Sequence, residues 1–182
     1  DYMRELDLPE SDLWQDPAPD IGILSAPLEV HIALTNKCSA GCPHCYMDSS
    51  RPDPGELDTN QFKKALQILA DAGIFHVALG GGEALEREDL FEIANYARQI
   101  GLVPNLTVSG RLITPQIAEK MTVFGQVNIS MDGIGAMYGV FRGNDLFNIA
   151  DRAIDMLIQA GVPTGINCVL GQRNYHGLED LF

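Results

Sequence analysis

The sequence predicts an α/β fold in which parallel strands carry their helices on the outside. From about residue 28 onward, short β-prone runs alternate with segments whose apolar residues recur at helical spacing. Several of these segments end in glycine, which interrupts both helices and strands. Repeated strand–helix units with right-handed crossovers build either a barrel or a doubly wound sheet, and the pattern alone leaves both open.

The first unit consists of a strand at 28–35 and a helix at 58–73. The helix has an apolar side formed by Phe62, Ala65, Leu66 and Leu69. Asp58 and Gln61 have the spacing of a capping box, so we expect the helix to begin directly after Asp58. Gly73 is suited to its end.

The second and third units follow directly. A strand at 73–82 ends in glycines, and the helix expected at 87–101 also ends in glycine. The third strand is expected at 101–110 and its helix at 114–121. Thr114 is a suitable cap for that helix, and the proline that follows suits a first helical turn.

The fourth unit pairs a strand at 126–133 with a helix at 144–161, and a fifth strand is expected at 162–171. The helix has an apolar side formed by Ile149, Ala153 and Leu157. Residues 178–182 are predicted to start another helix. Because the pattern stops before a closing strand, we expect this chain to be part of a longer polypeptide.

Ligands bind at the carboxyl ends of the strands in both candidate folds. We therefore expect the functional residues in the loops that follow the strands. These loops are 36–57, 80–86, 109–113, 131–143 and 171–177.

Size and composition describe a globular protein. The 182 residues are 46% apolar and 20% charged, which is ordinary for a domain with one core. The net charge of −13 repels polyanions, so we expect no nucleic-acid partner. No run approaches the ~20 apolar residues that cross a bilayer, and no export leader is recognisable. We therefore expect no membrane span and a cytoplasmic location.

The acidic residues are concentrated at the start of the chain. Residues 1–20 hold seven acidic residues and one arginine. We expect an acidic N-terminal extension over 1–25 and the folded core over 26–182.

Three of the four cysteines lie in one short stretch, CSAGCPHCY at 38–46. Cys38, Cys42 and Cys45 form a C-x3-C-x2-C pattern. Cys168 stands apart and is expected to pack as a small apolar residue. Clustered cysteines in a cytosolic chain more often bind metal or carry out redox chemistry than form structural disulfides.

Three interpretations of this loop remain open on the residues alone. A structural zinc site needs four ligands, and the loop has three cysteines. A thiol redox pair would use Cys42 and Cys45 and would leave Cys38 unexplained. A 4Fe–4S cluster on three thiolates would leave one iron open to a ligand from outside the protein.

The cysteine loop, placed after the first strand of an α/β chain, resembles the cluster loop of the radical SAM superfamily. The resemblance implies a 4Fe–4S cluster on Cys38, Cys42 and Cys45, with S-adenosylmethionine (SAM) bound to the fourth iron. It also implies reductive cleavage of SAM to a 5′-deoxyadenosyl radical that takes hydrogen from a substrate. The expected fold becomes a partial (β/α) barrel that ends before the barrel is complete.

GGGE at 80–83, after the second strand, strengthens the resemblance. It matches a Gly-Gly-Glu motif that holds the methionine amino group of SAM in the family. The resemblance therefore implies that Gly81, Gly82 and Glu83 bind the cofactor, and a carboxylate does suit an ammonium.

Further motifs follow the third and fourth strands. NISMDG at 128–133 and FRG at 141–143 match the Ser-Leu-Asp-Gly and Arg-Gly motifs of one branch of the family. They imply that Ser130 faces the ribose or carboxylate of SAM and that Arg142 pairs with the carboxylate. In TVSG, Ser109 replaces the asparagine of Thr-Asn-Gly, and its hydroxyl can still bond a ribose.

Two other residues have less defined expectations. His44 lies where the family usually has an aromatic residue near the adenine, which implies a packing role there. Asp132 is expected either to touch substrate or to cap the turn at Gly133.

The motifs resemble most closely the branch that carries SPASM or Twitch extensions and modifies peptides or cofactors. This implies a peptide or protein side chain as the substrate, with a cofactor or haem precursor as the alternative. Auxiliary iron–sulfur clusters would lie outside this chain, and the electron donor would be a protein such as flavodoxin or ferredoxin. A structural zinc module and a thiol redox module remain distant alternatives.

Overall fold

The structure is a computed structural model that describes residues 26–143 and 145–181. A five-stranded sheet has the order β1-β2-β3-β4-β5, and all neighbouring strands are parallel. The strands are β1 (Glu29–Thr35), β2 (His76–Gly81), β3 (Val103–Val108), β4 (Val127–Ser130) and β5 (Thr164–Asn167). The five expected strands are thereby confirmed. The acidic extension expected over 1–25 lies outside the described residues.

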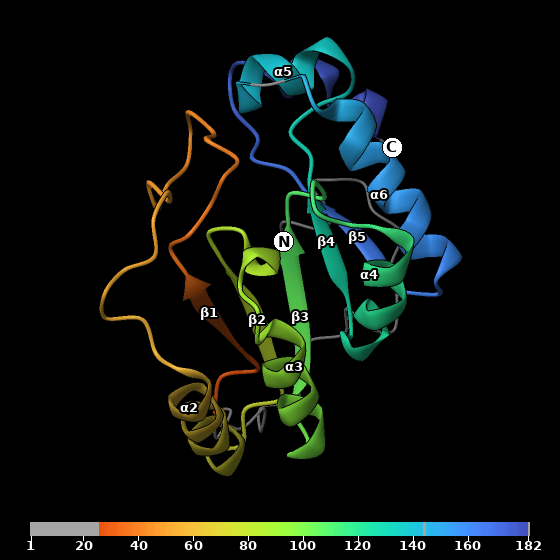
Figure 1. Cartoon of the computed structure of the whole chain (residues 1–182). Coiled ribbons are helices and arrows are strands. Elements are labelled where there is room, and N and C mark those ends of the chain that lie inside the picture. The colour runs from red at the N-terminus through yellow and green to blue at the C-terminus, as the bar shows by residue number, and fades with distance from the viewer. Residues whose placement is uncertain (1–25, 144, 182) are drawn as a thin grey trace, which may run out of the picture.

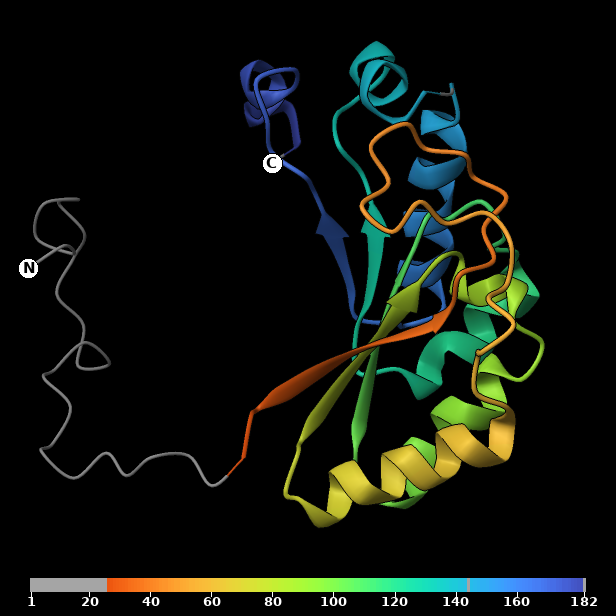
Figure 2. The same cartoon turned by 90° about the vertical axis from the view of Figure 1, so that its left-hand side faces the viewer.

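The strand order decides between the two folds left open by the pattern. Each crossover moves one strand further in the same direction, whereas a doubly wound sheet requires a reversal. The helices therefore lie on one side of the sheet, as Figure 1 and Figure 2 show. They are α2 (Thr59–Asp71), α3 (Leu90–Gln99), α4 (Pro115–Lys120) and α6 (Phe147–Gln159). With β1 and β5 as open edges, the architecture is the expected partial barrel.

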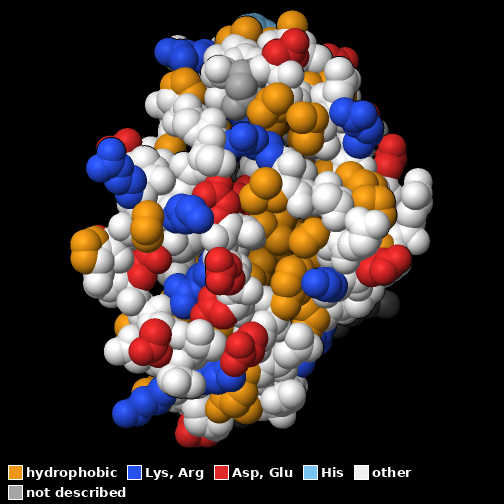
Figure 3. Space-filling view, viewed as in Figure 1, with side chains coloured by type: hydrophobic (Ala, Val, Ile, Leu, Met, Phe, Trp, Pro, Cys, Tyr) orange, Lys and Arg blue, Asp and Glu red, His pale blue; other side chains and the backbone are white. Residues whose placement is uncertain are grey.

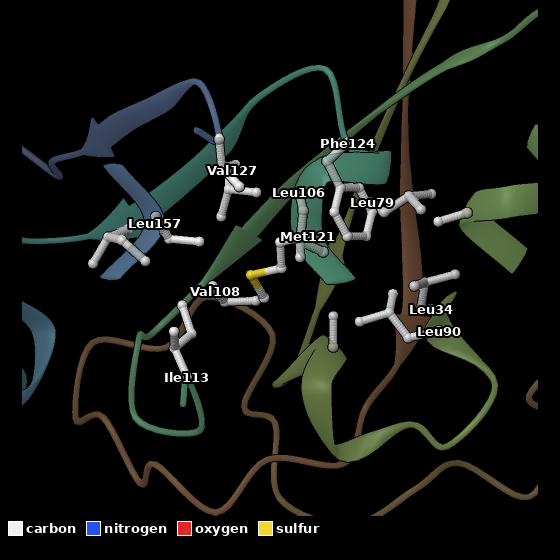
Figure 4. Close-up of a cluster of buried hydrophobic side chains, with 14 of the residues drawn as sticks. Leu34, Leu79, Leu90, Leu106, Val108, Ile113, Met121, Phe124, Val127 and Leu157 are labelled. Atoms are coloured by element: carbon white, nitrogen blue, oxygen red, sulfur yellow. The ribbon is translucent and has the colours of Figure 1, made fainter. Parts of the chain in front are cut away.

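The core lies between the sheet and these helices (Figure 4). In β3, Leu106 and Val108 are buried on the helix side, and Asn105 and Thr107 on the opposite face are only half-buried. Because side chains alternate along a strand, one face of each strand packs on the helices. The other face, called the inward face below, lies on the side of the sheet away from the helices. The inward face of the sheet is therefore available to line a site.

The helix starts follow the local sequence signals. Asp58 and Gln61 form a complete capping box at the start of α2. Thr114 accepts a hydrogen bond from the backbone of Ile117 at 3.2 Å and caps α4, whose first residue is Pro115. Both expected caps are confirmed.

The expectations for the fourth and fifth units are partly wrong. Residues 131–143 were expected as a loop, but they contain helix α5 (Ala136–Arg142). This helix has seven residues between Gly135 and Gly143, too few for a helical repeat to emerge from the sequence. Strand β5 is shorter than 162–171, because it ends at Asn167.

The helix predicted at 178–182 is also corrected. Its described part forms a short 3-10 helix, with another just before it. The 3-10 helices are η2 (Ala84–Glu86), η3 (Met121–Val123), η4 (Tyr175–Gly177) and η5 (Glu179–Leu181).

The surface seen in Figure 3 mixes acidic and basic side chains around a central group of apolar ones. This face is therefore not uniformly negative, although the chain has a net negative charge. In the described ranges, no helix combines the length and apolarity needed to cross a bilayer.

The end of β2 approaches the backbone of the cysteine loop very closely. Gly82 donates its N–H to the carbonyl of Thr35 at 2.7 Å, and Glu83 donates to that of Lys37 at 2.9 Å. A Cβ on Gly82 would lie 2.3 Å from the Lys37 carbonyl oxygen, and one on Gly81 would lie 2.6 Å from that of Thr35. Glycine is required here because only a residue without a side chain permits this contact.

We expect Gly82→Ala to lower the stability of the chain by about 1–3 kcal/mol, as overpacking does elsewhere. The cause is the clash of the new methyl group with the backbone at Lys37. Gly80→Ala is the matched control, because a Cβ there meets nothing within 4 Å. Thermal unfolding of both variants tests this, and equal melting temperatures would contradict the close-contact argument.

Candidate cofactor site

The cysteine loop joins β1 to α2 and lies at the carboxyl ends of the strands (Figure 2). Two carboxylates tie its backbone in place. Glu56 accepts hydrogen bonds from the Asn36 N–H at 2.6 Å and the Thr35 hydroxyl at 3.0 Å. Glu86 accepts one from the Ser39 N–H at 2.8 Å. Burial works against ionisation of both carboxyls, but these hydrogen bonds outweigh it and lower the pKa of each.

Cys38, Cys42 and Cys45 are free thiols and half-buried. Backbone N–H groups point at two of their sulfurs: that of Ala40 lies 3.5 Å from Cys38 Sγ, and that of Ser49 lies 3.4 Å from Cys45 Sγ. Such donors stabilise thiolates, which are the form that binds metal.

The two outer cysteines differ in acidity. Burial alone would raise the pKa of Cys45, but hydrogen bonds from Ser49 and from the backbone of Met47 and Asp48 outweigh it and lower the pKa. Burial raises the pKa of Cys38, and its hydrogen bond from the following turn only partly offsets the effect. Cys45 is therefore the more easily ionised of the two.

The three cysteines open into a cavity of about 800 Å³. This volume is within the usual range of small-molecule and cofactor sites. All residues that the sequence analysis assigned to the site line this one cavity. They are Cys38, Cys42, His44, Cys45, Gly81, Gly82, Glu83, Ser109, Ser130 and Arg142. The structure thus brings together residues from four strand-end segments, which is what the parallel topology requires.

Glu83 is a buried carboxylate in the cavity wall, 4% exposed. One of its oxygens accepts hydrogen bonds from both the N–H and the hydroxyl of Ser109, and the other accepts from the Leu85 N–H at 3.4 Å. The Ser109 hydroxyl, expected to bond a ribose, is turned toward Glu83 in this structure. Ser109 therefore orients the carboxylate.

Burial raises the pKa of Glu83, although the hydrogen bonds from Ser109 and Leu85 act in the opposite direction and the charge of Glu86 adds to the increase. A cation that enters the cavity would stabilise the ionised form of this carboxyl, because it offsets the free-energy cost of burying the negative charge.

Asp132 is fully buried and contacts the cysteine loop through His44. Its Oδ2 lies 2.7 Å from Arg142 Nε and 3.5 Å from His44 Nε2, and its Oδ1 accepts from the Val169 N–H at 2.7 Å. His44 also donates through Nδ1 to the Phe141 carbonyl at 3.0 Å. Asp132 is thus an internal anchor for two site residues, a role that the sequence analysis missed. One aspartate in a strand-end motif does not indicate that it will pair with Arg142, because the pairing depends on the folded structure.

The inner face of the sheet adds residues that were not predicted. Asn167 donates to the Thr107 hydroxyl at 3.2 Å, and both side chains line the cavity. The alternation of β3 could have indicated Thr107, because it lies opposite the buried Leu106 and Val108. Cys168 also lines the cavity, and is only partly buried.

One geometric condition for a simple metal site is not met. In the part of the chain that the structure describes, no group of three or more His, Cys, Asp or Glu side chains is arranged to hold a single metal ion.

Comparisons with known proteins agree with the motif analysis. The family model described as the Radical SAM superfamily matches residues 32–182. The mycofactocin maturase MftC of Mycobacterium tuberculosis is 35% identical over 161 residues, which cover 86% of this chain and 41% of that protein. An AdoMet-dependent heme synthase of Methanosarcina barkeri is 35% identical over 167 residues, covering 89% and 48%. The chain therefore spans less than half the length of these relatives.

A solved structure shows the same fold. SuiB of Streptococcus suis, in its complex with the precursor peptide SuiA, superposes with a TM-score of 0.75 at 20% identity. The superposition covers 87% of this chain and 36% of SuiB.

The raised pKa of Glu83 predicts a pH dependence of stability. The unfolded carboxyl ionises near its ordinary pKa of 4.5, whereas burial raises the pKa of the folded one above that value. Stability should therefore fall as the pH rises from that value through the folded pKa. Glu83→Gln should remove this decrease, because glutamine does not ionise.

Chemical denaturation of both proteins at a series of pH values from 4.5 upward measures the effect. Glu88→Gln, at an exposed position, controls for the loss of one negative charge. Parallel pH profiles for wild type and Glu83→Gln would contradict the prediction.

Proposed function

The chain belongs to the radical SAM superfamily, and on this premise we propose what its site binds and does. Membership supports the expected class of enzyme and its cofactors, a 4Fe–4S cluster and SAM. We assign the cluster to Cys38, Cys42 and Cys45. The observation that supports this assignment is the shared cavity, which all three cysteines line together with the buried Glu83.

The residues around the cavity fit SAM. When bound, the cluster and SAM supply one-electron cleavage of the sulfonium and a 5′-deoxyadenosyl radical that takes a hydrogen atom. Glu83 would hold the methionine ammonium, and Gly81 and Gly82 line the same cavity. Ser109 keeps that carboxylate oriented, and Ser130, which also lines the cavity, would bond a ribose or carboxylate group of SAM.

Two further residues lie beside the cysteines. Arg142 offers five N–H donors, so its guanidinium can serve the SAM carboxylate in addition to Asp132. His44 is held by Asp132 and packs its ring against Phe141 at 4.5 Å, which leaves it suited to a packing role near the adenine.

The substrate that we propose is a side chain of a peptide or protein. Relatives named as maturases and the SuiB complex with its precursor peptide support this choice. The alternative is a haem or cofactor precursor, which the heme synthases among the relatives support. The full protein would carry a SPASM or Twitch extension with auxiliary clusters, take electrons from a flavodoxin or ferredoxin, and reside in the cytoplasm.

Anaerobic reconstitution with iron and sulfide, followed by dithionite and SAM, tests the proposal. We expect a protein that retains iron and produces 5′-deoxyadenosine. A structural zinc module would instead be colourless and hold zinc, and a thiol redox module would form a reversible disulfide without iron. Adding candidate peptides or porphyrins then separates the two substrate classes by which one increases turnover.

Cys38→Ala, Cys42→Ala and Cys45→Ala should each abolish SAM cleavage, because three thiolates are needed to anchor the cluster. Iron content and 5′-deoxyadenosine report the result. Cys168→Ala removes a thiol from the same cavity and should leave the iron content unchanged. Normal cleavage in any of the first three variants would overturn the ligand assignment.

A further inference from the structure

We infer that Arg142 tunes the cluster by a charge-assisted hydrogen bond to the Cys42 sulfur, and that Asp132 is the positioning residue that holds it there. The inference rests on the proposed function, because it requires a cluster on Cys42. It assigns to Asp132 a task for which the sequence offered no indication, and to Arg142 a contact other than the one implied for SAM.

The geometry is a short chain of three groups. Asp132 Oδ2 lies 2.7 Å from Arg142 Nε, and Arg142 Nη1 lies 3.7 Å from Cys42 Sγ, within reach of a hydrogen bond to sulfur. Asp132 is fully buried and Arg142 is 9% exposed, so water screens this arrangement poorly. The second oxygen of Asp132 accepts the Val169 N–H, which fixes the carboxylate itself.

Helix α5 is built to place the guanidinium against the loop. Arg142 is the last residue of α5, and Gly143 follows with φ of +74°. A Cβ on Gly143 would lie 2.7 Å from Pro43 Cδ, so the glycine lets the end of the helix rest on the residue next to Cys42. His44, on the other side of Pro43, contacts both Asp132 and the Phe141 carbonyl. These contacts fix α5 and the cysteine loop relative to each other.

The electrical consequence follows from the orientation of the pair. The Arg142 guanidinium lies next to the Cys42 sulfur, and the Asp132 carboxylate contacts the guanidinium. The nearest charge to a Cys42 thiolate in this arrangement is therefore positive. Reduction adds one electron to the cluster. Hydrogen bonds and positive charge at the sulfurs stabilise the reduced form and raise the reduction potential. Arg142 should therefore make the cluster easier to reduce.

Potentiometric titration of the reconstituted full chain without SAM, followed by electron paramagnetic resonance, tests this. In Arg142→Met we expect the reduced-to-oxidised ratio at a given potential to fall about tenfold, which is a negative shift of about 59 mV for a one-electron couple. Arg142→Lys keeps the charge but loses the planar fork, and should lie between wild type and Arg142→Met. Arg152→Met is the matched control, because Arg152 is an exposed cation on α6 away from the cavity lining.

The Asp132→Asn variant distinguishes the positioning of Arg142 by Asp132 from the direct effect of the Asp132 charge on the reduction potential. Removing a negative charge near the cluster would by itself raise the potential. If Asp132 holds Arg142 on the sulfur, its loss should lower the potential instead, so a rise overturns the positioning role. If Arg142→Met fails to retain iron, Arg142→Lys and Asp132→Asn decide the outcome.

Failures of the two proposals can be distinguished. Wild-type protein that takes up no cluster refutes the proposed function and this inference with it. Wild-type protein that takes up a cluster and cleaves SAM, with the same potential in Arg142→Met, refutes the tuning role alone.

Discussion

The backbone contact between the end of β2 and the start of the cysteine loop is the constraint on which the site depends. Hydrogen bonds from Gly82 and Glu83 bind this edge to Thr35 and Lys37, and side chains cannot intervene because two glycines occupy the approach. The cysteines are thereby fixed on one side of the junction and the Glu83 carboxylate on the other, facing the same cavity. A contact between backbone groups therefore positions both the cysteines and the Glu83 carboxylate of the proposed site.

The sequential strand order supplies the room for that site. Because every crossover runs the same way, the helices lie on one side, and the opposite face of the sheet presents residues such as Thr107, Ser130 and Asn167 to the cavity. Parallel sheets are usually covered on both faces. Here the half-buried Thr107 and Ser130, the exposed Asn167 and the buried Glu83 line one cavity, an arrangement suited to a polar ligand.

Much of this could be predicted from the sequence, for physical reasons that differ between features. The strands and long helices follow from periodicity, and the caps at Asp58 and Thr114 follow from local hydrogen bonding. Helix α5 was not predicted, because its seven residues are too few to show a helical period of apolar residues. The predicted site residues line one cavity because motif spacing places them at strand ends. The contacts of Asp132 with Arg142 and of Ser109 with Glu83 were not predicted, since they depend on side-chain directions that only the folded chain defines.

The carboxylate tethers of the cysteine loop have a thermodynamic consequence. Glu56 and Glu86 accept hydrogen bonds from the backbone N–H groups of Asn36 and Ser39, and these bonds fix part of the loop backbone. Ordering a flexible loop would otherwise subtract from the affinity of whatever it captures. If the loop binds the proposed cluster, this fixed backbone would leave more of the iron–thiolate bonding energy for retaining it.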